Sequence, residues 1–147
     1  MRIDMDPKEY LEQYLPNKAQ AKVIEAELDE IADTLKSIKI DGMPSRDVIN
    51  HPTETAAIKL IEARERYQTK LDEANAICKD IIDTINSIDD AKSIRLLHLK
   101  YCKDASWAVI AYELHYSLDY VKKELHNKAL EQFDVAAKRR ALKGGTK

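Results

Sequence analysis

Two stretches of this chain repeat apolar residues in alternating steps of three and four. The first runs from about Pro16 to Lys39, and the second runs from about Thr53 to Ser87 and contains neither Gly nor Pro. This spacing is that of the a and d positions of a coiled coil, so it predicts two long helices with narrow apolar seams. The seams are Ala21, Ile24, Leu28, Ile31, Leu35 and Ile38, then Leu60, Arg64, Tyr67, Leu71, Ala74, Cys78, Ile81, Ile85 and Ile88, with Arg64 as the polar exception.

The segment Asp41-Gly42-Met43-Pro44 separates the two seams. We expect it to break the first helix and a loop to continue through about Pro52, with Thr53 as the N-cap of the second helix. Two seams joined by a short loop predict an antiparallel helical hairpin. The seams can pack within one chain or between two chains. We favour a homodimer, because two DNA-binding modules would match the two half-sites of a DNA target.

A short helix is expected before the first seam. Asp6 can cap it, Pro7 suits its first position and Glu9 completes a capping box. Pro16 is expected to end or kink this helix. Because the second long helix is longer than the first, either residues 1–15 or another protomer would cover its far end.

The charge of the chain is unevenly distributed. Residues 1–88 hold 12 Lys and Arg against 18 Asp and Glu, a balance of −6, whereas residues 89–147 hold 12 against 8, a balance of +4. The net charge of −2 therefore conceals a basic C-terminal part. Cys78 and Cys102 have the usage of reduced cytosolic thiols, and no apolar run is long enough for a membrane span. We expect a cytoplasmic protein.

The stretch from Ile94 to Phe133 loses the heptad spacing and predicts three shorter helices. The first runs from about Asp89 to Cys102, Ser106 caps the second, and Ser117 caps the third after a tight turn at His115. This is the arrangement of a helix-turn-helix, with Ala111, Leu114, Val121 and Leu125 between its last two helices. A three-helix packing module that does not touch DNA has the same pattern.

The outer face of the third predicted helix is polar and mostly basic. In a helix-turn-helix this face enters the major groove, and helix starts offer backbone N–H groups to phosphate. The candidate DNA-binding residues are Ser106, Ser117, Asp119, Lys122, Lys123, His126 and Lys128.

The strings LLHLKY and SWAVIAYELHYSLDYVKKELHNKAL resemble the region-4-type helix-turn-helix of sigma factors, and more closely the RinA/ArpU group of phage late-gene transcriptional regulators. The resemblance spans roughly residues 10–133 and departs from the group at Asp119 and Glu124, where more basic residues are usual. It implies sequence-specific binding near a phage late promoter and contact with the host RNA polymerase. The matching positions are Leu96, Leu97, Leu99, Tyr101, Ser106, Trp107, Ile110, Ala111, Leu114, Tyr116, Ser117, Val121, His126, Ala129 and Leu130.

Catalysis and cofactors have little support in this sequence. It holds no GxGxxG, P-loop or GxSxG motif, and His98 with Cys102 is too small a set for a closed zinc site. We therefore predict a non-enzymatic, all-α protein without cofactor or metal: an assembly hairpin over 1–88, a DNA-binding module over 89–137 and a frayed basic tail over 138–147. Two alternatives are a small terminase subunit and a protein-interaction adaptor.

Overall fold

The computed structural model describes residues 5–41 and 51–145. These residues form helices and no strand, which confirms the all-α prediction. The loop expected over 42–50 lies outside the described part. The chain divides into two compact units: residues 18–75, here called the paired-helix unit, and residues 1–17 with 76–147, here called the multi-helix unit. The regions predicted from sequence, 1–88, 89–137 and 138–147, are defined by their expected roles in assembly, in DNA binding and as a basic tail. Those three roles remain predictions.

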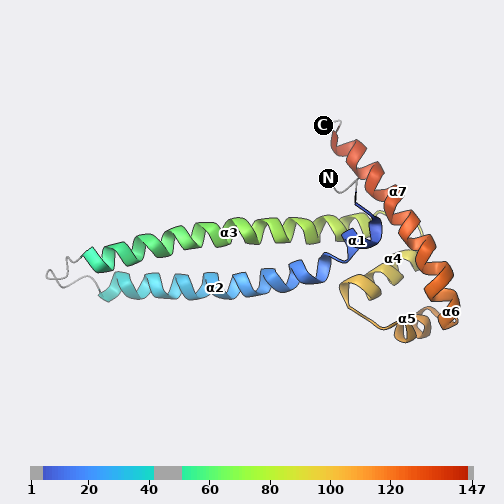
Figure 1. Cartoon of the computed structure of the whole chain (residues 1–147), viewed down its shortest axis with the longest axis horizontal. Coiled ribbons are helices and arrows are strands. Elements are labelled where there is room, and N and C mark those ends of the chain that lie inside the picture. Colours follow the sequence, from blue (N-terminus) through green and yellow to red (C-terminus); the bar gives the residue numbers. More distant parts are fainter. Residues whose placement is uncertain (1–4, 42–50, 146–147) are drawn as a thin grey trace. The chain divides into compact units, whose positions relative to one another are not determined.

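Helices α2 (Tyr14–Asp41) and α3 (His51–Asn86) supply the paired-helix unit. Within it they lie side by side and run in opposite directions (Figure 1). Its core is formed by seam residues of both helices, with small Ala21 and Ala74 beside Ile24 and Leu71. Helix α3 begins two residues before Thr53, so the N-cap prediction at Thr53 is wrong. Pro52 falls in the first turn, where its missing N–H breaks no helical hydrogen bond.

The N-terminal segment also differs from expectation. Helix α1 (Pro7–Leu11) begins after Asp6, but the Asp6 side chain makes no capping bond. The helix ends before Pro16 instead of at it, and Pro16 lies in the first turn of α2. The ring of a proline clashes with the carbonyl four residues earlier, which is that of Glu12, so the chain turns at Glu12 and Gln13.

The multi-helix unit is built from α1, the end of α3 and the C-terminal helices. These are α4 (Ala91–Leu97), the π-helical η3 (His98–Cys102), α5 (Trp107–Leu114), α6 (Leu118–Tyr120), the π-helical η4 (Val121–Leu125) and α7 (His126–Gly145). Helices α1 and α4 both pack on α7. The core draws on every one of these helices except the short α6, and its largest fully buried side chains are Phe133, Leu11, Ile81, Ile85, Leu96, Leu97, Ile110 and Val121.

Residues 138–145, which we expected to fray, belong to α7. Ala136 is buried just before them, and Arg140 donates a hydrogen bond to Asp80 of α3 over 3.2 Å. Asp80 also accepts a hydrogen bond from the hydroxyl of Tyr10 over 2.7 Å. Residues 138–145 are therefore helical, and Arg140 connects them to α3 within the multi-helix unit. None of the helices in the described ranges has the length and apolar character that a membrane span requires.

Candidate nucleic-acid interface

The candidate interface is formed by α5 and by the helical segment that starts at Leu118. Both helix starts are capped as predicted. The side chain of Ser106 accepts a hydrogen bond from the backbone N–H of Val109 over 3.2 Å, and that of Ser117 accepts one from Tyr120 over 3.2 Å. Each serine thus satisfies a backbone donor that the helix leaves unpaired. Asp90 caps α4 in the same way.

The turn between α5 and α6 has a fixed geometry. His115 lies in the left-handed region, with φ 63° and ψ 43°. The N–H of Tyr116 donates to the carbonyl of Ala111 over 3.1 Å, and that of His115 donates to Tyr112 over 3.3 Å. This is the hydrogen-bond pair of a Schellman motif, which ends α5 and redirects the chain into α6.

The two helices meet through small and aliphatic side chains. Ala111 and Leu114 of α5 are buried, as are Val121 and Leu125 of η4. Because these side chains occupy the inner side, the polar residues of the same segment are left outside. Lys122, Lys123, Asp119 and Lys128 are all exposed, as are the capping residues Ser106 and Ser117. Six of the seven candidate residues therefore lie on the surface.

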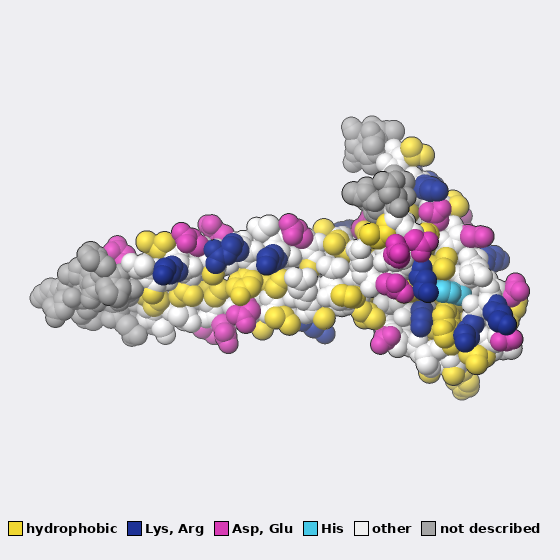
Figure 2. Space-filling view, viewed as in Figure 1, with side chains coloured by type: hydrophobic (Ala, Val, Ile, Leu, Met, Phe, Trp, Pro, Cys, Tyr) yellow, Lys and Arg dark blue, Asp and Glu magenta, His cyan; other side chains and the backbone are white. Residues whose placement is uncertain are grey.

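Charge on this surface is mixed. Lys123 and Asp119 form an ion pair one helical turn apart, with Nζ and Oδ2 3.8 Å from each other. Figure 2 shows Lys and Arg side chains next to acidic and hydrophobic ones at the end of the unit that carries α5 and α6. The Lys122 and Lys128 ammonium groups add positive charge, which leaves the segment from Ser117 to Lys128 net basic.

His126, the seventh candidate residue, does not lie on the outer face, so that prediction is wrong. The residue is only 8% exposed, and its Nε2 is 2.6 Å from the hydroxyl of Tyr101. Its ring also meets Trp107 edge-on, with centroids 4.8 Å apart. His126 begins α7 and precedes the buried Ala129 and Phe133 by three and seven residues, so α-helical spacing places it on the buried side of that helix.

Burial fixes the chemistry of this cluster. Removal from water lowers the pKa of His126 to about 4, with a smaller contribution from the positive charges of Lys8 and Lys100. Burial likewise raises the pKa of Tyr101. Lys100 lies over the Trp107 ring at 4.6 Å from its centroid. At neutral pH, His126 is therefore neutral, and its contact with Tyr101 connects the start of α7 to η3. This contact helps to position the candidate face, but His126 itself is not part of that face.

Several exposed apolar residues of this region were missed by sequence analysis. Val109 and Tyr112 lie on the outside of α5, and Leu118 and Tyr120 flank Asp119. Two of them have a signal in the sequence, because Val109 and Tyr120 each come directly before a core position and so fall outside the three-and-four spacing. Together the four residues give the interface an apolar component beside its charges.

The surroundings of His98 and Cys102, the two residues considered as metal ligands, do not favour metal binding. The ring of His98 is hydrogen-bonded to the side chain of Asn86, at 3.0 Å from Nε2 to Oδ1. Burial raises the pKa of the Cys102 thiol to about 11, which disfavours the thiolate that metal binding needs. The described residues contain no group of three or more His, Cys, Asp or Glu that could hold a metal ion.

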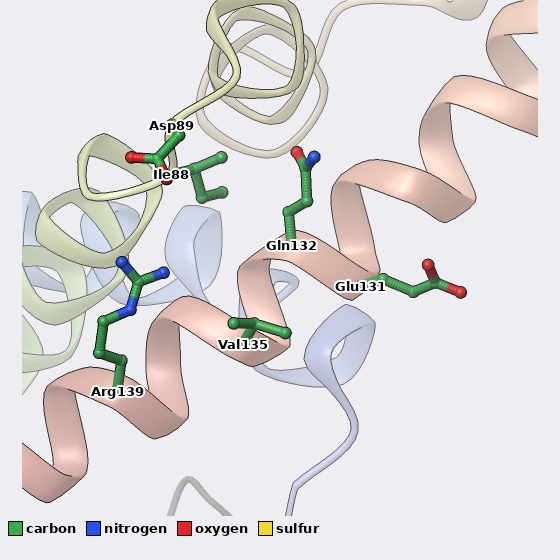
Figure 3. A pocket seen from close by; sticks show the side chains of 6 residues that line it. All are labelled: Ile88, Asp89, Glu131, Gln132, Val135 and Arg139. Carbon is green, nitrogen blue, oxygen red and sulfur yellow. The ribbon is translucent and has the colours of Figure 1, made fainter.

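A cavity of about 290 Å³ lies elsewhere in the multi-helix unit, between Ile88–Asp89 and α7. Figure 3 shows the side chains of Asp89, Gln132, Val135 and Arg139 around it, with Glu131 pointing away. The side-chain oxygen of Gln132 is buried without a hydrogen-bond partner among the described residues. None of the candidate DNA-binding residues lines this cavity.

No family model matches the chain, and neither a curated protein nor a solved structure matches it.

Proposed function

We propose that this chain is a sequence-specific DNA-binding transcriptional regulator, in which α5 and the segment from Leu118 act as a helix-turn-helix. The regulation of phage late genes, which the sequence resemblance implies, is part of this proposal. The mechanism is binding and not catalysis. Double-stranded DNA is the partner, and host RNA polymerase is the second expected contact.

One observation carries the proposal. Lys122 and Lys123 are exposed on a helical segment whose inner side, through Val121 and Leu125, is buried, and this segment packs on α5. A helix held in this way from behind presents its front as a rigid convex surface. The major groove admits one α-helix, and lysines at its rim can reach phosphate oxygens.

The capped helix starts support the same orientation. Ser106 and Ser117 keep their first turns ordered, so backbone N–H groups at both starts have fixed directions. In helix-turn-helix complexes such N–H groups and nearby side chains contact the backbone and set the register. Recognition of bases then falls to the side chains that follow Ser117.

The test is the salt dependence of DNA binding. We expect Lys122→Ala with Lys123→Ala to weaken binding and to lower the slope of log affinity against log salt by about 0.9 for each phosphate that the variant no longer neutralises. Fluorescence anisotropy with a labelled duplex at several salt concentrations measures both. An unchanged slope would contradict the proposed face.

A matched control separates this face from total charge. Lys59 and Lys70 are exposed on α3 in the paired-helix unit, so Lys59→Ala with Lys70→Ala removes the same two charges. We expect this variant to keep the slope of the unchanged protein. An equal decrease in both double variants would mean that binding follows net charge and not the candidate face.

A second candidate function has its own observation. Val109 and Tyr112 are 47% and 78% exposed on α5, and apolar side chains of this size suit a protein partner. In that case the module is an adaptor. Retention of the purified chain on RNA polymerase but not on duplex DNA would favour it, and disappearance of that retention in Tyr112→Ser would assign the contact.

A further inference from the structure

We infer that Asp119 and Lys123 together read one C·G base pair, an assignment that rests on the proposed function. Asp119 is, with Glu124, one of two acidic residues in a segment whose other charged residues are lysines. A carboxylate lowers general attraction to DNA, because it is repelled by the phosphates that the lysines attract. Its place on the face therefore calls for a specific role.

The two side chains occupy the most outward part of the helix. Asp119 precedes the buried Val121 by two residues, and Lys123 follows it by two. In α6, about 100° per residue turns Asp119 roughly 160° from Val121. In the wider π-helical η4, two residues make somewhat less than half a turn, so Lys123 also lies on the side away from Val121. The side chains of Asp119 and Lys123 are accordingly 79% and 73% exposed. A helix that enters a groove with Val121 behind it brings these two groups to the bases first.

The pattern of donors and acceptors selects the base pair. A C·G pair presents its major-groove donor, the cytosine N4 amino group, at one end and the guanine acceptors O6 and N7 at the other. In an A·T pair the adenine N6 donor lies between two acceptors, N7 and the thymine O4. A carboxylate only accepts and an ammonium only donates. The separated charges of Asp119 and Lys123 therefore match a C·G pair. Opposite an A·T pair, the carboxylate would have an acceptor on each side of it, adenine N7 and thymine O4.

The ion pair in the free protein is easily exchanged for these contacts. Its 3.8 Å separation exceeds direct hydrogen-bond length, and both groups are in water, where such pairs contribute little. On docking, Asp119 can accept from cytosine while Lys123 donates to guanine. Opposite an A·T pair, the acceptors beside N6 repel Asp119, so this residue disfavours the wrong site more than it strengthens the right one.

The test compares three proteins by selection from a random duplex library, followed by titration of single sites. For the unchanged chain we expect one strictly selected C·G position, whose replacement by A·T weakens binding about fivefold to tenfold. Asp119→Ala is expected to bind both duplexes within about twofold and non-specific DNA at least as well as before. The matched control is Glu124→Ala, which removes the same charge from the next position along the helix, on a different side from Lys123, and should keep the discrimination.

A chemical probe tests the lysine separately. Replacing the guanine of the selected pair by 7-deazaguanine removes N7, which should weaken binding of the unchanged chain and leave Lys123→Ala unaffected. Retention of the C·G preference in Asp119→Ala would overturn the inference while DNA binding itself stands. Absence of binding to every duplex at low salt would overturn the proposed function and this inference with it. Circular dichroism checks that each surface variant is folded.

Discussion

The paired-helix unit and the multi-helix unit bury their apolar side chains in different ways. In the described part of the paired-helix unit, one line of contacts joins two helices, and Leu28 and Tyr67 of this seam are half-buried. In the multi-helix unit, α1, α3, α4, α5 and α7 approach from several sides, and Phe133 is 1% exposed. A layer that is covered on both sides excludes water from its middle, whereas a single seam does not. We expect most of the folding free energy to come from the multi-helix unit.

The largest expected effect follows from this difference. Phe133→Ala should lower the free energy of unfolding of the multi-helix unit by about 3–5 kcal/mol, because it leaves a cavity in a closely packed core. The sequence holds one tryptophan, Trp107, which lies in this unit. Urea titration followed by Trp107 fluorescence therefore measures the decrease where it occurs.

The matched variant in the other unit is Ile24→Ala. Ile24 is also buried, at 4% exposed, but it packs in the single seam. We expect far-UV circular dichroism to show a lower stability while the Trp107 transition keeps its midpoint. Equal shifts of both signals in both variants would mean that the units unfold as one, and the distinction between them would fail.

Spacing predicts the paired-helix unit better than the multi-helix unit. Steps of three and four place Ala21, Ile24, Leu71 and Ala74 on facing sides of two helices, and these residues form its core. The caps Ser106 and Ser117 are also predictable, since a serine before an apolar helical run has a local physical role. Local rules and one period suffice for such features.

The errors come from register and from tertiary contacts. The prediction from sequence counts His126 with the outer face, although its spacing from the buried side chains of α7 places it on the inner side of that helix. The composition of the tail predicts fraying, whereas the Arg140–Asp80 contact that holds it joins residues 60 positions apart. The contact of Arg140 with Asp80 has no local signature. The roles of Lys122 and Lys123 in binding DNA remain predictions.

The second effect is acid sensitivity specific to the multi-helix unit. Burial lowers the pKa of His126 to about 4, below the usual 6.5. Between these values the unfolded chain binds a proton that the folded chain does not. The free energy of unfolding should therefore fall as pH decreases from about 6.5 to 4, by at most about 1.4 kcal/mol per pH unit. Urea titrations at several pH values, followed by Trp107 fluorescence, measure this slope.

The variant His126→Gln removes the titrating group and keeps an acceptor for the Tyr101 hydroxyl. We expect a lower stability at pH 7 but a flatter dependence on pH. His98→Gln is the comparison, because burial lowers the pKa of His98 as well but its ring is less buried. If the pH dependence of stability persisted in His126→Gln and disappeared in His98→Gln, the acid sensitivity would belong to His98 and the prediction would be wrong.

The smallest expected effect concerns backbone strain, which also differs between the units. Both positive-φ residues other than Gly in the described ranges, Asp104 and His115, lie in the multi-helix unit. A left-handed residue other than Gly costs about 1–2 kcal/mol of stability, and glycine avoids this cost. Glycine also makes the unfolded chain more flexible, which lowers the free energy of unfolding by up to about 1 kcal/mol. We therefore expect His115→Gly to raise the free energy of unfolding by up to about 1 kcal/mol, as measured by urea titration. His115→Ala separates the two causes, because it deletes the imidazole without easing the backbone. If alanine stabilised as much as glycine, the side chain and not φ would be responsible, and the turn before α6 would hold no strain for the surrounding core to offset.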